Sequence, residues 1–176
     1  SGAVGHLAIQ LAKYRGAKVI TTARPGRNKR LKDLGADFVL DYNDDKLDQK
    51  VLECAPRGVD LAVEVEFGKN IGMIPKIMRP MGTVFIYGSG KNMTPQFPFG
   101  EYLFKSLKLN LVLVYLMPMR LRKKLINVLH DAYVNNALAP SIDIIYDFSE
   151  CAKAHERVMK PGRNGAVLLK IDCKTH

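Results

Sequence analysis

The residues best suited to chemistry are two glycines close to the start of the chain, in Gly2-Ala3-Val4-Gly5, followed by a pattern typical of a small-residue, apolar helix. A glycine at the first position lets the backbone approach a pyrophosphate, and one at the last lets a helix pack closely on a sheet. The unpaired N–H groups of the first helical turn would then face the phosphates. Taken alone, this motif fits a tight turn as well as it fits a nucleotide site, because a G-x-x-G before a helix occurs in many folds.

The end of the next predicted strand carries arginines where an NAD site carries an acid. NAD sites place Asp or Glu roughly 20 residues after the loop, where it accepts hydrogen bonds from the ribose. Here that stretch reads Thr22-Ala23-Arg24-Pro25-Gly26-Arg27, and no acid occurs before Asp33. A guanidinium can bind a 2′-phosphate through two charge-assisted hydrogen bonds. We therefore predict that Arg24 and Arg27 bind this phosphate and that the cofactor is NADP(H). The alternative is an exposed basic start of a helix.

The ends of later strands supply further candidates, because ligands of open α/β sheets sit at the carboxyl ends of strands. Those ends carry Tyr42, Phe67 and Tyr87-Gly88-Ser89. We predict that Tyr42 stacks on or covers the adenine and that Gly88 and Ser89 meet the nicotinamide. Each aromatic side chain fits a core or rim position equally well.

The elements that would position these residues alternate between strand and helix. The predicted strands are 18–23, 37–42, 59–65, 83–87 and 109–116, and the predicted helices are 6–15, 28–34, 47–54, 71–78 and 120–135, with a turn at 80–82 and a loop around Pro95 and Pro98. This alternation predicts an α/β fold with a parallel sheet and right-handed crossovers. We expect a doubly wound Rossmann fold of strand order 3-2-1-4-5-6, with its first, central strand expected before Ser1.

The last part of the chain departs from this repeat. It carries a predicted strand at 142–146, a helix at 150–159 and a strand at 166–171. We therefore predict two parts, a Rossmann domain at 1–136 and a C-terminal segment at 137–176.

Composition narrows the class of protein. The 176 residues carry a net charge of +10, which favours anionic partners, although a solvated basic surface explains such a charge equally simply. Two groups stand out, Arg24, Arg27, Lys29, Arg30 and Lys32, and then Arg120, Arg122, Lys123 and Lys124. Cys54, Cys151 and Cys173 are far apart, which predicts reduced thiols, a cytoplasmic protein and no zinc site. The longest apolar run, 107–119, is too short to span a bilayer, so we expect no membrane partner.

Several segments resemble the medium-chain dehydrogenases/reductases, in particular their zinc-independent quinone oxidoreductase, or zeta-crystallin-like, branch. The resemblance begins with Ser1-Gly2-Ala3-Val4-Gly5-His6-Leu7-Ala8-Ile9-Gln10-Leu11-Ala12-Lys13 and covers nearly the whole chain. It continues through Leu34-Gly35-Ala36-Asp37, Gly58-Val59-Asp60, Arg79-Pro80-Met81-Gly82-Thr83-Val84, Ala152-Lys153-Ala154-His155-Glu156 and Gly165-Ala166-Val167-Leu168-Leu169. The chain departs from the family at Ala3, where glycine is common, and at Val65-Glu66-Phe67-Gly68, where an Asp and a small residue are common.

The resemblance implies an NADPH-dependent oxidoreductase that transfers hydride or electrons to a quinone, enone or related carbonyl acceptor. It also implies a GroES-like catalytic domain before this segment, and a homodimer that joins sheets through the edge strand 109–116. We predict no catalytic residue in this chain: His6, His130, His155 and His176 are isolated, and a proton donor would come from the other domain. Two alternatives stay open, an RNA-binding module on a Rossmann scaffold and a non-catalytic relative that keeps the fold.

Overall fold

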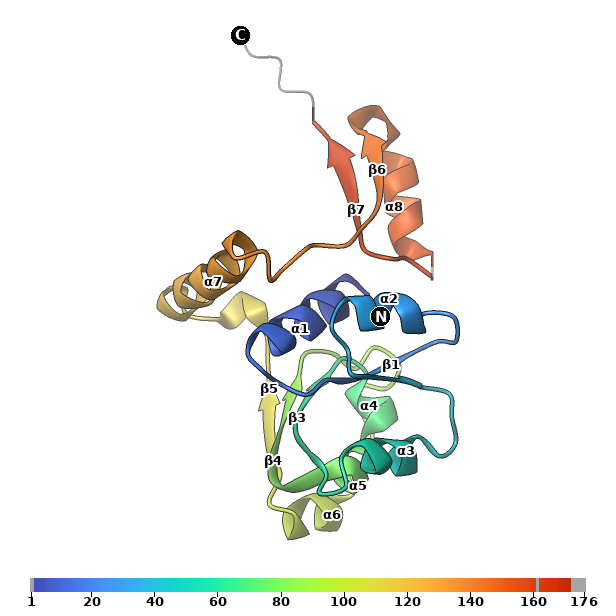
Figure 1. Cartoon of the computed structure of the whole chain (residues 1–176), viewed down its shortest axis with the longest axis vertical. Helices are drawn as coiled ribbons and strands as arrows, with labels where there is room; N and C mark the ends of the chain where they lie inside the picture. The colour runs from blue at the N-terminus through green and yellow to red at the C-terminus, as the bar shows by residue number, and fades with distance from the viewer. Residues whose placement is uncertain (1, 161, 172–176) are drawn as a thin grey trace. The chain divides into compact units, whose positions relative to one another are not determined.

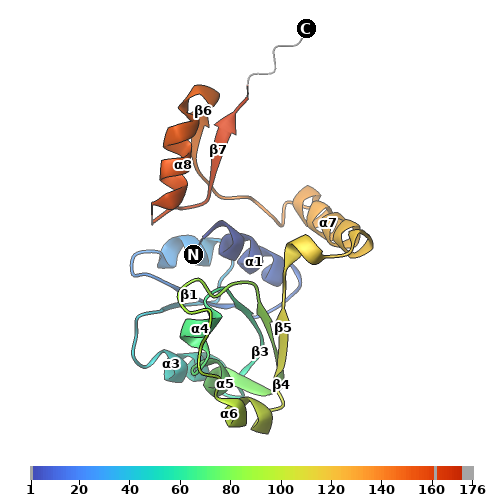
Figure 2. The same ribbon diagram turned by 180° about the vertical axis from the view of Figure 1, so that it is seen from behind.

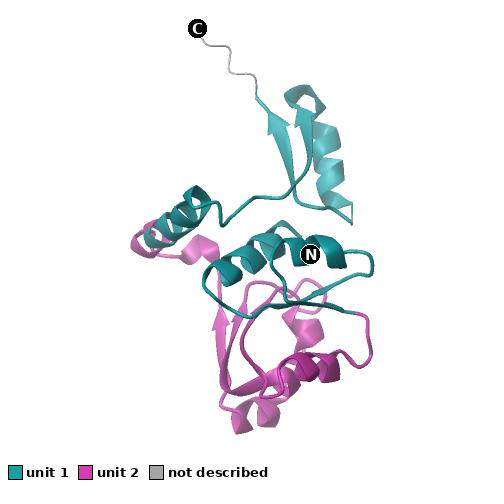
Figure 3. Cartoon of the chain, viewed as in Figure 1, with its two compact units in different colours: residues 1–42, 124–176 teal, residues 43–123 magenta. Residues whose placement is uncertain are grey.

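The computed structural model describes residues 2–160 and 162–171, and the chain forms two compact units (Figure 3). Unit 1 comprises residues 1–42 and 124–176, and unit 2 comprises residues 43–123. The division predicted from sequence, 1–136 and 137–176, differs from these units, and it stays a prediction.

The first half of unit 1 alternates helix and strand as predicted (Figure 1). It consists of α1 (Ala3–Tyr14), β1 (Ile20–Ala23), α2 (Asn28–Asp33) and β2 (Phe38–Asp41). β1 and β2 are parallel, with Ile20 opposite Phe38. Their core joins one residue from each helix to the strand side chains, namely Ile9, Ala23, Leu31 and Ala36, with Val19, Leu34 and Val39 packed against them.

Helix α1 begins three residues earlier than the predicted start at His6. Gly2 is the N-cap, with an extended backbone (φ −90°, ψ −178°), and its carbonyl accepts the first helical hydrogen bond from His6 N at 3.0 Å. Gly5 therefore lies in the first turn of the helix rather than in the preceding loop. The helix ends before Gly16, whose positive φ of 79° is a conformation that glycine adopts without a steric penalty.

The second half of unit 1 is a parallel β-α-β arrangement, the kind of unit predicted for the end of the chain. α7 (Met119–Val134) is one continuous helix that begins in unit 2 and ends in unit 1. It is followed by β6 (Ile142–Asp147), the 3₁₀ turn η2 (Phe148–Glu150), α8 (Cys151–Met159) and β7 (Ala166–Lys170). Figures 1 and 2 show α8 lying beside the parallel pair β6–β7.

Half-buried polar groups join the elements of this second half, and the buried Gln10 joins it to α1. The Asp143 carboxylate accepts from Arg157 Nε at 2.7 Å and from Asn164 N at 2.8 Å, which joins β6 to α8 and to the loop before β7. The Gln10 side chain in α1 donates to Ala139 O at 3.1 Å and accepts from Ala139 N at 2.7 Å. Gln10 thereby satisfies both backbone groups of a residue 129 positions away, as a neighbouring strand would.

Unit 2 is a three-stranded parallel sheet with short helices. Its elements are α3 (Leu47–Cys54), β3 (Val59–Glu64), α4 (Phe67–Asn70), α5 (Ile74–Ile77), β4 (Met78–Ile86), α6 (Phe99–Phe104), β5 (Lys108–Leu111) and the 3₁₀ turn η1 (Val114–Leu116). The strand order is β3-β4-β5, and every pair is parallel. Ile74, Met78 and Val84 are the largest apolar side chains at its buried centre.

Four details of unit 2 differ from the sequence prediction. The helix predicted at 71–78 is only α5, and β4 starts at Met78, running through the turn predicted at 80–82. A register shift between Val59 and Leu61 accommodates that turn sequence, and Met81 takes a positive φ of 61°. The strand predicted at 109–116 ends at Leu111, because β4 ends at Ile86 and Val112 N makes the last bond to it. Helix α6 occupies part of the predicted loop.

Every strand pair in the described residues is parallel and every crossover contains a helix or turn, which confirms the α/β, Rossmann-type fold class. Within the described part of the chain, β1 pairs only with β2, and β3 pairs only with β4. The predicted central strand would precede Ser1 and so lies outside the described residues. In residues 2–160 and 162–171 we find no helix with the length and apolarity needed to cross a bilayer.

Candidate functional site

The start of α1 offers its backbone N–H groups to an anion. No side chain caps this end of the helix, and no acidic residue lies in its first turn. A Cβ atom at Gly2 or Gly5 would meet no atom within 4 Å, so the first turn is open where a phosphate would approach. The same observation means that the close packing predicted for Gly5 finds no neighbour among the described residues. Ala3 and Val4 form the beginning of the helix itself.

Arg24 and Tyr42 come together at the carboxyl ends of β1 and β2. Each follows directly on its strand, and Tyr42 N donates to Ala23 O at 3.3 Å. Arg24 Nε donates to the Tyr42 hydroxyl oxygen at 2.6 Å. A guanidinium carries five N–H donors, and this bond uses one of them and restrains the orientation of the group. Tyr42, which we predicted to cover the adenine, thus orients the arginine predicted to bind the 2′-phosphate.

Arg27 lies at the N-cap of α2 and contacts the loop that precedes β7. Its Nη2 donates to Gly162 O at 2.9 Å, and Arg30 Nη2 one turn later donates to Asn164 O at 3.2 Å. Asn164 Oδ1 is buried and has no hydrogen-bond partner among the described residues. Sequence reasoning missed Arg30 and Asn164 as neighbours of this site, because the hydrogen bonds between α2 and the loop before β7 join residues more than 130 positions apart.

The pKa of His6 shows that Arg27 and Arg30 lie close to the start of α1. The His6 side chain is 1% exposed, and its Nδ1 has no partner among the described residues. Burial lowers the pKa of His6, and the positive charges of Arg30 and Arg27 lower it further. His6 is therefore neutral at pH 7, and unit 1 assembles an electropositive region around the first turn of α1.

The predicted residues of unit 2 gather at the ends of β3 and β4. Phe67 N donates to Gly88 O at 3.2 Å, and Gly68 N donates to Ser89 Oγ at 2.8 Å. The Ser89 hydroxyl in turn donates to Asn92 O, so its hydrogen-bonding capacity serves the loop. A Cβ at Gly88 would lie 2.7 Å from Val65 O, which shows that the close approach of two strand ends requires glycine there.

The two aromatic residues of this group have different surroundings. Phe67 packs its ring edge-on against Tyr102, with centroids 6.5 Å apart and planes at 71°, which is a core contact. Tyr87 stays exposed at the rim. Partial burial of its hydroxyl raises the pKa of Tyr87, and the negative charge of Glu64 raises it further.

The acidic residues of this loop organise its backbone. Glu64 accepts from Glu66 N at 2.6 Å and from Asn70 Nδ2 at 3.0 Å. Glu66 accepts from Lys91 N at 3.0 Å. The glutamate that departs from the family pattern therefore ties together the segments that follow β3 and β4.

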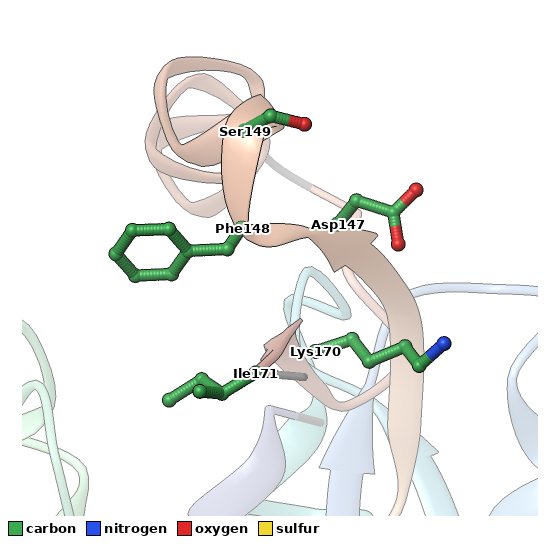
Figure 4. Close-up of a pocket in the computed structure, with 5 residues that line it drawn as sticks. All are labelled: Asp147, Phe148, Ser149, Lys170 and Ile171. Atoms are coloured by element: carbon green, nitrogen blue, oxygen red, sulfur yellow. The ribbon is translucent and has the colours of Figure 1, made fainter. Parts of the chain in front are cut away.

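A pocket in unit 1 is lined by none of the predicted site residues. It is lined by Asp147, Phe148, Ser149, Lys170 and Ile171, at the ends of β6 and β7 (Figure 4). Phe148 and Ile171 point to one side of it, whereas the charged groups of Asp147 and Lys170 point to the other. Across residues 2–160 and 162–171, no three His, Cys, Asp or Glu side chains cluster closely enough to hold a metal ion.

Comparison with known proteins places this fold in a family. The family model described as "Zinc-binding dehydrogenase" matches residues 3–131. The mitochondrial NAD(P)H oxidoreductase RTN4IP1 of Drosophila melanogaster is 27% identical over 183 residues, an alignment that covers 97% of this chain and 44% of that protein.

Solved structures of two oxidoreductases share the fold of this chain. A putative alcohol dehydrogenase from Sinorhizobium meliloti 1021 is similar with a TM-score of 0.84 and 26% identity, over 97% of this chain and 49% of that one. The quinone oxidoreductase of Pseudomonas syringae pv. Tomato DC3000 shares the fold, with a TM-score of 0.81 and 22% identity, over 97% of this chain and 54% of that one. The chain thus spans about half the length of these proteins. Because the family model covers well over half of the chain, the protein belongs to the zinc-binding dehydrogenase family, within the medium-chain dehydrogenases/reductases that its glycine loop and first helix resemble.

Proposed function

We propose that this chain is the cofactor-binding part of an NADPH-dependent oxidoreductase that reduces a quinone, an enone or a related carbonyl acceptor. Membership of an oxidoreductase family supports the reaction class. The choice of NADPH and the class of acceptor go further and are the substance of the proposal.

The observation that carries it is the Arg24–Tyr42 pair at the end of β1. β1 itself ends at Ala23 and is followed by Arg24, without the acid that an NAD site places at the end of this strand to accept from the adenosine ribose. This strand end supplies instead a guanidinium held in place by a tyrosine, with Arg27 at the start of the next helix. Arginine is the residue best suited to bind a phosphate through two parallel hydrogen bonds.

In this proposal the chain binds and orients, and the cofactor supplies the hydride. The open first turn of α1 binds the pyrophosphate, and Arg24 and Arg27 bind the 2′-phosphate. The ends of β3 and β4 in unit 2, with Tyr87, Gly88 and Ser89, are proposed to contact the nicotinamide, Gly88 and Ser89 through their backbone. The described residues do not fit a zinc ion, so we derive no step through one.

The test is calorimetric titration of the chain with NADPH and with NADH. We expect tighter binding of NADPH, and loss of that preference when Arg24→Ala and Arg27→Ala are combined. An activity assay tests the reaction separately: it measures oxidation of NADPH by quinones or enones with the longest polypeptide that contains this chain. Equal affinities for the two cofactors would remove the NADPH assignment while leaving the family unchanged.

A homodimer through the segment 109–116 is a second part of the proposal. Within the described residues, β5 pairs with β4 on one side only, and Leu111 and Tyr115 are each more than 80% exposed. An apolar strand edge without a neighbour favours pairing with a second copy. Light scattering after size exclusion tests it: Leu111→Lys should convert a dimer to a monomer, and a wild-type monomer would contradict it. Cytoplasmic location remains a prediction, and RNA binding remains an open alternative.

A further inference from the structure

The loop before β7 holds two arginines of α2 through its backbone. Gly162 O accepts from Arg27 Nη2 at 2.9 Å, and Asn164 O accepts from Arg30 Nη2 at 3.2 Å. Arg27 and Arg30 are three positions apart, so they are neighbours on one side of the helix. Each of these bonds uses only one of the five N–H donors of a guanidinium. The loop therefore restrains both side chains and leaves them able to donate to a ligand.

These contacts orient the two guanidinium groups without neutralising their charge. A carbonyl oxygen carries no net charge, and within residues 2–160 and 162–171 neither Arg27 nor Arg30 forms an ion pair with a carboxylate. The ion pairs in this part of the chain use other cations, namely Lys13, Lys50, Lys76, Arg79, Lys153 and Arg157. After burial, the charges of Arg30 and Arg27 are what lowers the pKa of His6 in the first turn of α1. Two like charges one turn apart repel each other, and a phosphate bound beside them would offset this repulsion.

A carboxylate in β6 holds the loop itself. Asp143 Oδ1 accepts from Asn164 N at 2.8 Å, while its Oδ2 accepts from Arg157 Nε at 2.7 Å, and both bonds are partly buried. Gly162 has a positive φ of 89°, a conformation that glycine adopts without a steric penalty. The position of Gly162 O thus depends on the Asp143 carboxylate and on a backbone conformation that favours glycine.

We propose that the loop 162–164 is a positioning element of the NADPH site: it holds Arg27, with Arg30 beside it, in the orientation that binds the 2′-phosphate, and Asp143 is a positioning residue that acts through this loop. The inference rests on the proposed function, in which Arg27 contacts the 2′-phosphate. A side chain that is ordered before the ligand arrives loses less conformational entropy on binding. The C-terminal segment 137–176 would then set cofactor preference without contacting the cofactor.

The experiment is calorimetric titration of NADPH and of NADH into the wild type and two loop variants. Asp143→Ala removes the acceptor of Asn164 N. Gly162→Ala adds a Cβ that meets no atom within 4 Å, but alanine is strained at this φ, so the peptide that carries Gly162 O is expected to turn. Because Arg27 must then be ordered when the cofactor binds, we expect each variant to bind NADPH roughly 2- to 12-fold more weakly and NADH as before.

Two control variants separate positioning from a loss of stability. Arg157→Ala breaks the other bond of the Asp143 carboxylate but leaves Asn164 N its acceptor, so it should lower stability and keep the ratio of the two affinities. Gly16→Ala creates a similar strain, at a φ of 79° and with open space around the Cβ, just after α1 rather than in the loop. It should also keep the ratio. Circular dichroism shows whether each variant is folded.

An unchanged ratio of NADPH to NADH affinity in Asp143→Ala would overturn the inference, and Gly162→Ala decides in the same way if Asp143→Ala does not fold. An equal loss for both cofactors counts as an unchanged ratio, because it would show a general distortion of the site. The proposed function fails differently: the wild type would then bind the two cofactors equally, and the inference would fall with it. If Arg27→Ala lowers the ratio and the loop variants do not, the proposed function stands and only the role of the loop is refuted.

Discussion

Tyr42→Phe tests the role of the tyrosine beside Arg24. The substitution keeps the ring and removes only the hydroxyl oxygen that accepts from Arg24 Nε at 2.6 Å. The ring could still cover an adenine, but the guanidinium would no longer be held in one orientation. We therefore expect NADPH to bind more weakly and NADH to bind as before.

The magnitude follows from the exposure of the pair. A hydrogen bond to a charged group is worth about 1.5–3 kcal/mol when it is protected from water. Arg24 is exposed, so water replaces most of the lost bond, and an exposed interaction of this kind contributes about 0.5–1 kcal/mol. This corresponds to roughly a 2- to 5-fold loss of NADPH affinity. Arg24→Ala removes the phosphate contact itself, and we expect a loss of about 10- to 150-fold.

A double-mutant cycle measured by isothermal titration calorimetry reads out the coupling, since the chain contains no tryptophan to report binding by fluorescence. Tyr42→Phe should have no effect on NADPH affinity in the Arg24→Ala background. Tyr14→Phe, on the exposed Tyr14 of α1, is the matched control and should change nothing. If Tyr42→Phe weakens NADPH and NADH equally, the tyrosine covers the adenine and the reasoning about orientation is refuted.

Three further predictions concern stability. Asp143→Asn should lower the free energy of unfolding by about 1.5–3 kcal/mol in urea titrations at pH 7, because it weakens a charged pair with Arg157 that holds β6 to α8; an unchanged midpoint would contradict this. Hydrogen bonds from Arg157 and Asn164 hold the pKa of Asp143 below its usual value, and burial holds the pKa of His6 below 6.5. In both cases the unfolded chain takes up the proton at a higher pH than the folded chain does, so protonation favours unfolding. The urea midpoint of unfolding should therefore fall as the pH drops below 6.5, because of His6, and fall again in the acidic range, because of Asp143. A midpoint that does not change with pH would contradict both pKa shifts. Gly68→Ala should destabilise the loop after β3, because its Cβ would lie 2.0 Å from Asn92 O, whereas Gly72→Ala, with open space, should leave thermal melting unchanged; equal melting temperatures would refute the steric argument.

The periodic parts of the fold could be predicted from sequence. Helix α3 has the predicted bounds, Leu47–Cys54, because its apolar positions repeat at helical spacing and Pro56 follows it. β1 matches to within two residues, because a β-branched run, 19–22, lies between Gly16 and Gly26, and β2 matches to within one residue at each end. Local patterns of this kind depend only on neighbours in sequence.

The differences arise where tertiary contacts decide. Helix α6 forms because Tyr102 fits a buried site, with its hydroxyl donating to Ile71 O at 2.8 Å. The start of β4 at Met78 reflects pairing with Val59, which the turn sequence after it concealed. Neither contact leaves a signal in the local pattern.

In the candidate site, too, residue types could be predicted from the sequence, whereas tertiary contacts could not. The types of its residues were readable, since glycines and arginines at those positions suit phosphate binding. Their partners were not: the bond between Arg24 and Tyr42 and the contact of Arg27 with Gly162 join strand ends and loops distant in sequence.

The most direct test of the central claim is phosphorus NMR of NADP⁺ titrated with the chain, because it observes the 2′-phosphate separately from the pyrophosphate. The account predicts that the 2′-phosphate resonance shifts on binding and that Arg24→Ala with Arg27→Ala abolishes this shift while the pyrophosphate resonances still respond. A pyrophosphate response with an unperturbed 2′-phosphate resonance in the wild type would contradict it.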